Sequence, residues 1–214
     1  MSIEIKNQNI LVVCSHLDDE IFGMGGSIAK LAKDNNIHIY TYCHGINGQD
    51  DERIIKYYEN IDEIKNTFNG DIEGVVEGYD DLSLERYSTN ELCKCLENEI
   101  KGIGWKPDII FTHKPDTHND HICVSEVVDI YARHKNVNVL HFGIPGNNEV
   151  KPEFFIDITG FEKIKKKFIK KYNMKKYQGN HPLSPKKIKA RDNYYGGLIG
   201  VESAEIFEVK KICI

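Results

Sequence analysis

Residues 10–20 are Ile10-Leu11-Val12-Val13-Cys14-Ser15-His16-Leu17-Asp18-Asp19-Glu20, an apolar run that ends in one imidazole and three carboxylates. Unpaired charge in a low-dielectric interior costs several kcal/mol, so these groups cannot be buried without partners. The stretch therefore predicts a buried strand with a cluster of ionisable side chains at its carboxyl end.

A second cluster of the same kind follows another apolar run, residues 108–112. It consists of His113-Lys114-Pro115-Asp116-Thr117-His118-Asn119-Asp120-His121. In open parallel sheets ligands bind outside the carboxyl ends of the strands, so we expect the two clusters to converge. A catalytic zinc takes three protein ligands of the His, Asp or Glu type and lowers the pKa of its water to about 7. The two clusters supply such donors and leave carboxylate and imidazole groups for proton transfer.

Each cluster alone has a simpler interpretation. A histidine with aspartate neighbours at a strand end is more often a helix cap or a solvated loop. His118 and His121 can share their spacing by chance, because the chain has nine histidines. The occurrence of both clusters after apolar runs keeps the metal site and the simpler interpretations equally open.

Strands and helices are expected to alternate along the chain as far as Phe142. Hydrophobic runs and periodicity predict strands at 9–14, 37–43, 74–76, 108–112 and 137–142, and helices at 22–34, 52–68, 90–103 and 122–134. After Pro145 we expect a strand at 154–159 and helices at 160–176 and 186–198. This alternation implies βαβ units. The predicted fold class is α/β: a Rossmann-like, doubly wound, mostly parallel sheet with helices on both faces. Residues 1–214 are expected to form a single domain, with 145–214 as a C-terminal elaboration.

The composition is that of an ordinary soluble globular protein, with 40% hydrophobic and 29% charged residues. The net charge of -5 gives no reason to expect nucleic-acid binding. No apolar run approaches the roughly 18–20 residues of a transmembrane helix, and residues 1–6 do not resemble a signal peptide. The six cysteines have neither disulfide-framework nor zinc-ribbon spacing. We therefore expect free thiols and a cytoplasmic location.

The two clusters, in their order and separation, resemble the LmbE-like / PIG-L family of zinc-dependent N-deacetylases. The family's first motif has the form (P/A)-H-P-D-D-E-x-x-x-x-G-G, and the matching segment is Ser15-His16-Leu17-Asp18-Asp19-Glu20 with Gly25-Gly26. The second motif has the form H-P-D-H, and the matching segment is His118-Asn119-Asp120-His121. Residues 79–84, 106–113 and 204–207 are also similar to family segments. The resemblance spans nearly the whole chain and implies the LmbE-like fold.

This resemblance also implies roles for individual residues. The ligands of a Zn²⁺ ion would be His16, Asp19 and His121. Asp18 would be the general base toward the attacking water. His118 would stabilise the oxyanion as an imidazolium, and Asp120 would orient and charge His118. These roles are chemically coherent, because a carboxylate beside the water and a cation beside the oxyanion both favour the transition state.

The reaction implied by the resemblance is removal of the acetyl group from an N-acetylated amino sugar of the N-acetylglucosamine type, or from its conjugate. Two alternatives stay open: an amidase acting on another amide, such as a thiol or cysteinyl conjugate, and a non-catalytic sugar- or nucleotide-binding domain. Asp18, His118 and Asp120 argue against the binding domain, which needs no acid and base beside a metal. The expected partner is a small N-acetylated sugar or glycoconjugate, with no nucleic acid, and a homo-oligomer stays open.

Two departures from the family pattern concern the site. Leu17 and Asn119 stand where the family commonly has proline. Neither position supplies a functional side chain, so we expect changed loop rigidity and unchanged chemistry. An arginine that the family often carries after the second strand has no clear counterpart. Arg53 and Lys56 are the candidates for this substrate-binding role.

Several other features have a structural interpretation beside a functional one. The glycines of residues 23–26 do not fit a dinucleotide fingerprint, since Ile28 takes the third glycine position. We expect them to allow close helix packing and to favour an anion at a helix N-terminus. A face of the predicted helix 160–176 is expected to be solvent-exposed, with attraction of an anionic sugar as the alternative. Its lysines are Lys163, Lys165, Lys166, Lys167, Lys170 and Lys171. Tyr194 and Tyr195 are candidates for a gate or for packing, and Glu205 is expected to be structural.

Overall fold

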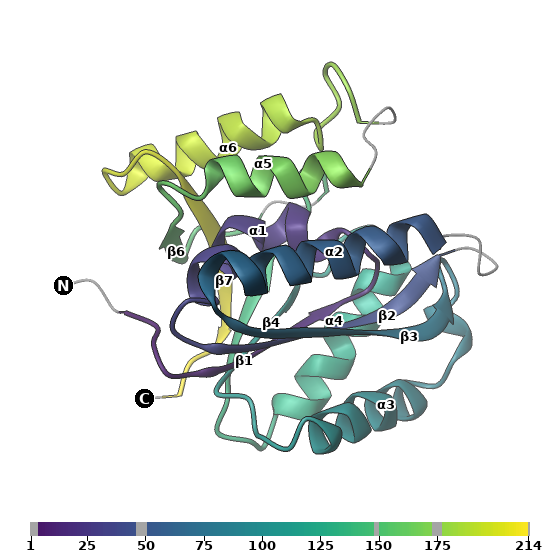
Figure 1. The fold of residues 1–214 in the computed structure, drawn as a ribbon. Helices are drawn as coiled ribbons and strands as arrows, with labels where there is room; N and C mark the ends of the chain where they lie inside the picture. The colour runs from purple at the N-terminus through teal and green to yellow at the C-terminus, as the bar shows by residue number, and fades with distance from the viewer. Residues whose placement is uncertain (1–3, 46–50, 148–149, 173–176, 214) are drawn as a thin grey trace.

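The computed structural model describes residues 4–45, 51–147, 150–172 and 177–213. Within these residues the core is a seven-stranded sheet with the order β3-β2-β1-β4-β5-β7-β6 (Figure 1). The strands are β1 (Asn9–Cys14), β2 (Asn36–Gly45), β3 (Asp71–Asp80), β4 (Ile109–His113), β5 (Asn138–Phe142), β6 (Phe154–Asp157) and β7 (Ala204–Lys211). The helices are α1 (Asp19–Leu31), α2 (Asp51–Phe68), the 3₁₀ turn η2 (Leu84–Arg86), α3 (Thr89–Gly102), α4 (Asn119–Ala132), α5 (Glu162–Lys171) and α6 (Pro185–Leu198). The strands from β3 to β5 are parallel, whereas β7 is antiparallel to both β5 and β6.

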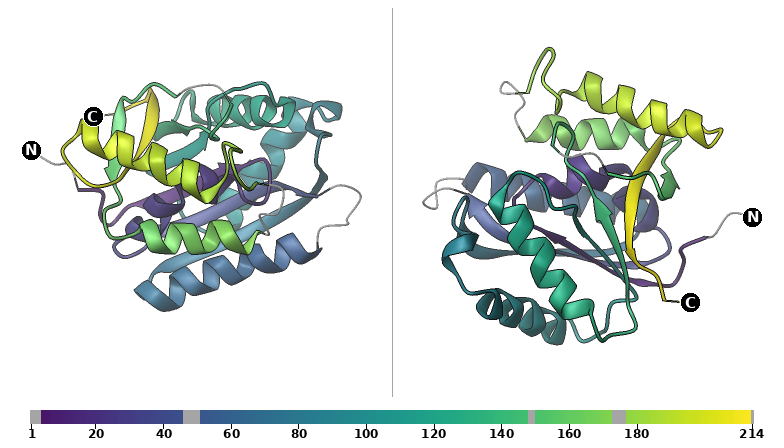
Figure 2. Two further views of the ribbon diagram at one scale, coloured as in Figure 1. Left: turned by 90° about the horizontal axis from the view of Figure 1, so that it is seen from above. Right: turned by 180° about the vertical axis from the view of Figure 1, so that it is seen from behind.

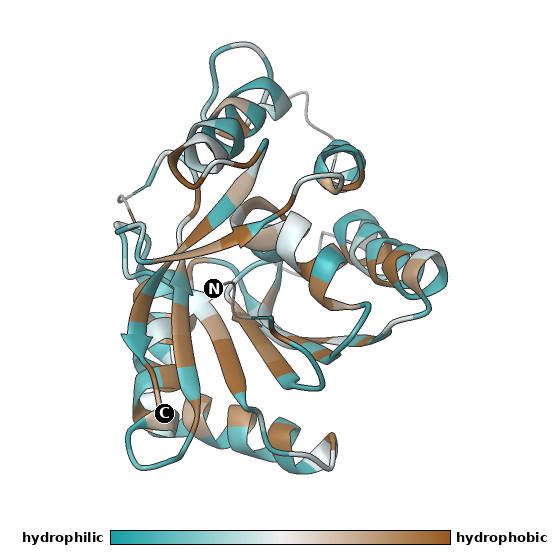
Figure 3. Ribbon diagram, turned by 90° about the vertical axis from the view of Figure 1, so that its left-hand side faces the viewer, coloured by the Kyte–Doolittle hydropathy of each residue, from teal (hydrophilic) through white to brown (hydrophobic). Residues whose placement is uncertain are grey.

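Both faces of the sheet are covered by helices. Successive side chains of a strand point to opposite faces, and β1 shows this clearly. Ile10, Val12 and Cys14 belong to the core shared with α1, α2 and α5, whereas Leu11 and Val13 belong to the core shared with α3 and α4. Figure 1 shows α1 and α2 above the sheet and α3 and α4 below it, and the strands at the centre are mostly hydrophobic (Figure 3). The predicted α/β, doubly wound, mostly parallel fold is confirmed.

The direction of winding reverses at β1. This strand pairs with β2 on one side and with β4 on the other, both in parallel. In such sheets, ligands bind outside the carboxyl ends of the strands where the order reverses. The two clusters of ionisable residues follow β1 and β4, so the topology brings them to this place.

The predicted elements match the structure within a few residues, with differences that have physical reasons. α1 begins at Asp19 rather than at residue 22, because the acidic residues of the first cluster occupy its first turn, where the helix dipole favours them. β3 has ten residues instead of the predicted three, because its pairing with β2 continues to Asp80. β7 is absent from the sequence prediction, since the buried Glu205 interrupts its apolar pattern. α5 begins at Glu162, and the end of its predicted range, 173–176, lies outside the described residues.

The glycines of residues 23–26 lie inside α1, which is kinked at Met24 (φ -150°, ψ 28°). A Cβ on Gly23 would lie 2.3 Å from the ring of Phe142, so glycine permits the close packing expected from the sequence. The kink frees the backbone N–H groups of Gly26 and Ser27, which donate to the carboxylate of Glu205 at 2.9 and 2.6 Å. The anion expected at a helix N-terminus is therefore a side chain of the protein itself.

One prediction for the lysine face of α5 is wrong. Lys165 was expected in solvent, but it is 2% exposed, and its Nζ lies 2.8 Å from Glu205 and 2.5 Å from Asp192 of α6. Burial alone would lower the pKa of Lys165, but the charges of Asp192 and Glu205 outweigh it and raise the pKa. The lysine therefore stays charged, since a buried ammonium between two carboxylates has its partners.

The other lysines on this face are exposed or pair with a neighbouring helix. Lys163, Lys166, Lys167 and Lys170 are exposed, as predicted. Lys167 and Lys171 form ion pairs with Glu63 of α2 at 2.5 and 2.9 Å. Figure 2, from above, shows α5 lying between α2 and α6.

All six cysteines are free thiols, as the sequence predicts. Among the described helices, none combines the length and the apolar character that crossing a membrane requires.

Candidate metal centre

The two clusters meet in one open cavity at the carboxyl ends of β1 and β4. Its volume is about 540 Å³. Its polar lining consists of His16, Asp18, Asp19, Arg53, Asp81, His118, His121 and Asn147. Its apolar lining consists of Phe22, Leu82, Ile144, Tyr172, Tyr177 and Leu183. The cavity thus combines titratable and apolar lining residues, as small-molecule sites commonly do.

His16 and Asp19 lie in the turn from β1 into α1 and face each other. The Asp19 Oδ2 atom accepts the backbone N–H of His16 at 2.8 Å and lies 3.3 Å from His16 Nδ1. The other ring nitrogen, Nε2, lies 2.9 Å from Asp120 Oδ2. One nitrogen of His16 is therefore held by a carboxylate while the other points at Asp19.

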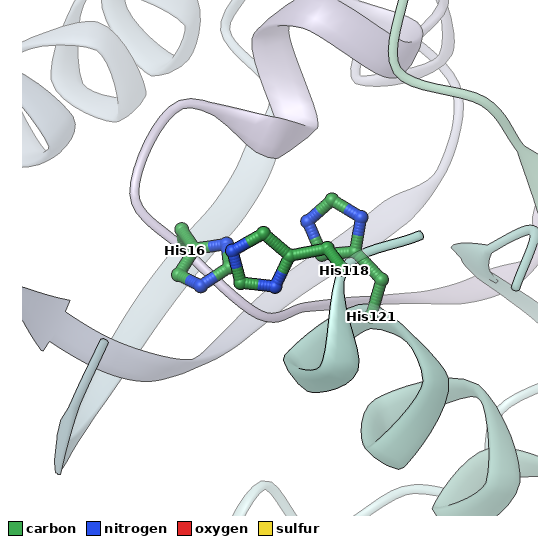
Figure 4. A group of neighbouring side chains, drawn as sticks. All are labelled: His16, His118 and His121. Atoms are coloured by element: carbon green, nitrogen blue, oxygen red, sulfur yellow. The ribbon is translucent and has the colours of Figure 1, made fainter. Parts of the chain in front are cut away.

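His121 repeats this arrangement from the first turn of α4. Its Nδ1 lies 2.8 Å from Asp116 Oδ2, which also accepts the side-chain amide of Asn147 at 2.6 Å. Its Nε2 lies 3.6 Å from Asp19 Oδ2. His118, three residues earlier, stacks on His121 with ring centroids 4.7 Å apart. Figure 4 shows both rings beside that of His16.

This geometry suits a divalent cation. One nitrogen each of His16 and His121 is directed at Asp19 Oδ2, and the remaining nitrogens are held by carboxylates, as in oriented metal-ligating histidines. Candidate ligand atoms of His16, His118 and His121 lie within 4.8 Å of one another, as do those of Asp19, His113 and His121. The sequence-predicted ligands His16, Asp19 and His121 are thus brought together, and their donor types fit a metal such as zinc.

The electrostatics of the site also favour a positive charge. Burial alone would lower the pKa of His16, but hydrogen bonds to Asp120 and Asp19 outweigh it and raise the pKa to about 10. Burial would raise the pKa of Asp19, yet the neighbouring His113 and His121 hold it well below its ordinary value. A field that holds a proton on His16 also stabilises a metal cation, so we expect the two to compete.

His113 and Asp116 contribute to the site although the sequence analysis gave them no role. The buried His113 stacks on His121 with centroids 4.0 Å apart and lies 3.2 Å from Asp19. Its Nε2 accepts the backbone N–H of Ser15 at 3.0 Å, which engages the lone pair. Burial, reinforced by the charge of His121, lowers the pKa of His113 to about 4. His113 therefore packs against His121 beside Asp19, and Asp116 orients His121.

Asp18, the general base that the resemblance implies, is among the residues that line the cavity. It is buried in the turn beside His16 and Asp19, with φ 105°, a left-handed conformation that aspartate tolerates better than most residues. Its backbone N–H donates to Glu20 Oε2 at 3.1 Å, and its Oδ2 accepts from Arg53 Nη2 at 3.1 Å. Burial raises the pKa of Asp18 to about 7 against the opposing charge of Arg53. A carboxylate with this pKa can take up and release a proton near neutral pH.

His118 and Asp120 lie at the N-terminal end of α4. The His118 Nδ1 atom accepts the backbone N–H of Asp120 at 3.3 Å, which assigns the neutral ring its proton on Nε2. Burial, with the nearby charges of His16 and His121, lowers the pKa of His118. The carboxylate of Asp120 contacts His16 rather than the ring of His118.

The candidate substrate residues on α2 differ in position. Arg53 lines the cavity and donates a hydrogen bond to the backbone carbonyl of Leu17. Its Nη1 atom lies 3.5 Å from Asp81 Oδ2. Lys56 pairs with Glu52 one turn earlier and is not among the described residues that line the cavity. Tyr194 and Tyr195 are also not among the described residues that line the cavity. Tyr172 and Tyr177 do line it, although the sequence analysis gave neither of them a role in the site.

Comparisons with known proteins agree with this architecture. Among solved structures, the conserved protein TT1542 from Thermus thermophilus is similar, with a TM-score of 0.76 and 22% identity over 97% of this chain and 96% of that chain. The N,N'-diacetylchitobiose deacetylase from Pyrococcus horikoshii, complexed with its inhibitor MPG, has a TM-score of 0.67 and 19% identity over 94% and 83% of the two chains. At such identities these two structures show the shared fold.

None of the curated proteins matches the chain in sequence. A sequence model of the PIG-L family, described as GlcNAc-PI de-N-acetylase, matches residues 11–132, which contain both clusters and more than half of the chain. The chain is therefore a member of the PIG-L family.

Proposed function

We propose that this protein is a zinc-dependent hydrolase that removes the acetyl group from an N-acetylated amino sugar of the N-acetylglucosamine type, or from its conjugate. Membership of the PIG-L family supports this proposal, and so does the shared fold with a chitobiose deacetylase. The observation that carries it is the convergence of His16, Asp19 and His121 in an open cavity, with Asp18 beside them.

The residues that would hold the zinc are His16, Asp19 and His121. When bound, zinc supplies Lewis acidity toward the acetamide carbonyl and the attacking water. Asp120 and Asp116 hold the outer nitrogens of the two histidines and so fix the directions of the inner ones.

Proton transfer falls to Asp18. Asp18 lines the cavity, and its pKa of about 7 lets it accept a proton from water as the oxygen attacks the acetamide carbon. When the C–N bond breaks, the same carboxyl group returns the proton to the leaving nitrogen. The products are the free amine and acetic acid, which carries the second proton of the water and releases it to solvent to become acetate, and Asp18 is again a carboxylate.

In this proposal His118 stabilises the negative charge that develops on the carbonyl oxygen. Its Nδ1 is engaged by the backbone N–H of Asp120, so Nε2–H is the donor that remains for the substrate in the cavity. A preorganised donor stabilises the transition state more than the ground state, because the charge on the oxygen exists only as the bond forms.

The proposal predicts acetate release from N-acetylglucosamine or N,N'-diacetylchitobiose. We expect release to stop after treatment with a chelator and to return with Zn²⁺, as measured by an acetate assay and by metal analysis. If zinc is bound stoichiometrically and no acetylated sugar yields acetate, the proposal is wrong. A panel of thiol and cysteinyl amides then tests the alternative amidase.

Variants of the three proposed ligands sharpen this experiment. His16→Ala, Asp19→Ala and His121→Ala are each expected to lose bound zinc, whereas His118→Ala is expected to keep zinc and lose turnover. His134→Ala is the matched control, because His134 is an exposed residue just beyond α4. Retention of zinc by all three ligand variants would contradict the assignment.

A further inference from the structure

Leu82 has an unusual backbone for its residue type. It lies in the turn between β3 and η2 with φ 60°, in the left-handed region that glycine adopts without penalty. Asn7, Asp18 and Asn69 are the other described non-glycine residues with positive φ. Their short polar side chains can bond locally, which makes this conformation tolerable. A leucine gains no such compensation from its own side chain.

The site itself holds Leu82 in this conformation. The backbone N–H of Leu82 donates to Asp120 Oδ2 at 2.7 Å, and that of Leu84 donates to Asp120 Oδ1 at 3.1 Å. The same Oδ2 lies 2.9 Å from His16 Nε2. Asp120 therefore joins the turn to a proposed metal ligand and fixes the backbone position of Leu82 relative to the site.

The side chain of Leu82 is not part of either core. It is 60% exposed, the second most exposed of the large hydrophobic side chains in the described part of the chain after Tyr194, and it lines the catalytic cavity. Neither core packing nor backbone preference explains a leucine here. Strained, over-determined residues cluster where a ligand binds, and an apolar side chain at a cavity mouth has an apolar ligand surface as its natural partner.

We infer that Leu82 is a specificity-determining residue that contacts the apolar face of the sugar ring attached to the reacting acetamide. This inference rests on the proposed function and narrows its substrate class. A pyranose presents a C–H face and a hydroxyl edge, which match the apolar and polar parts of the lining. Leu82, which lines the cavity, supplies contact for the C–H face. The preferred substrate is therefore a ring-closed N-acetylated sugar, and open-chain acetamides are poor substrates.

The test compares Leu82→Gly with wild type on N,N'-diacetylchitobiose. Glycine relieves the backbone and removes only the side chain, so melting temperature and zinc content are expected to stay close to those of wild type. The value of kcat/KM is expected to fall roughly tenfold or more, mainly through KM, as for the loss of an apolar contact with substrate. Leu82→Met restores an apolar side chain and is expected to recover most of this loss. Leu82→Asn tolerates the backbone without the apolar contact and is expected to resemble the glycine variant.

Leu198→Gly is the matched control, because Leu198 is 53% exposed at the end of α6 and is not among the described residues of the cavity wall. A kcat/KM of Leu82→Gly within twofold of wild type would overturn the inference. Calorimetric titration with N-acetylglucosamine separates it from the proposed function. Weaker sugar binding by Leu82→Gly supports the inference even if wild type releases no acetate, and equal binding refutes it.

Discussion

The proposed role of Asp18 as general base predicts that Asp18→Asn lowers kcat by about 10²–10⁴-fold without loss of bound zinc. Asparagine has nearly the same size as aspartate, tolerates the left-handed conformation at φ 105°, and can still accept a hydrogen bond from Arg53. It cannot take a proton from water. The variant thus removes the proposed base and leaves the turn in place, and measurements of kcat and of metal content test the prediction.

Asp81→Asn is the matched control for this variant. Asp81 also lies near Arg53 and lines the cavity, but it is not in the turn that carries His16 and Asp19. We expect Asp81→Asn to act on KM more than on kcat. Loss of zinc from Asp18→Asn together with its retention by Asp19→Asn would reverse the assignment of base and ligand.

Lys165→Met is expected to destabilise the protein by about 3–5 kcal/mol, because it leaves a buried charge without its partner. Methionine fills similar space, so little of this loss comes from packing. The carboxylates of Glu205 and Asp192 would remain in the interior without the ammonium group that now lies 2.8 and 2.5 Å from them. Urea denaturation monitored by circular dichroism measures the change.

The neighbouring Lys166→Met provides the comparison, since Lys166 is exposed on the same helix and surface substitutions usually change stability by less than about 0.5 kcal/mol. Equal stability of the two variants would show that the buried pairing contributes nothing. Adding Glu205→Gln to Lys165→Met is expected to recover part of the lost stability. The glutamine amide is uncharged, and its oxygen can still accept a hydrogen bond from one backbone N–H of α1.

The parts of the fold that followed from the sequence are those with a single, local cause. The apolar runs of β1, β2, β4 and β5 and the helical periodicity of α2 and α3 each specify an element without reference to the rest of the chain. The order of these elements then gives the parallel sheet, and the sheet brings the clusters after β1 and β4 together. The two clusters could be located for this reason, whereas the choice of His16, Asp18, Asp19, His118 and His121 within them came from the resemblance to the family.

The residues that were missed depend on partners far away in the chain. Lys165 occupies a lysine-rich segment like its neighbours, and only the carboxylates of Asp192 and Glu205 explain its burial. Asp116 could be seen in the second cluster, but its bond to His121 depends on the direction of the ring. The contact of Asp120 with His16 spans 104 positions, so a motif of four residues cannot predict it.

The bond from Glu205 to the kink of α1 has a consequence for synthesis of the chain. Gly26 and its acceptor Glu205 are 179 positions apart in the sequence. During translation, the residues of the kink therefore leave the ribosome long before Glu205 is synthesised. Until β7 emerges, two buried amides of α1 lack their partner, and the turn that carries His16, Asp18 and Asp19 is joined to an unfinished helix. Because such distant contacts form slowly, we expect the nascent N-terminal half to hold its strands before it holds an ordered catalytic turn. Docking of β7 would then complete the proposed metal site, so we expect metal binding only after residues 204–211 have joined the sheet.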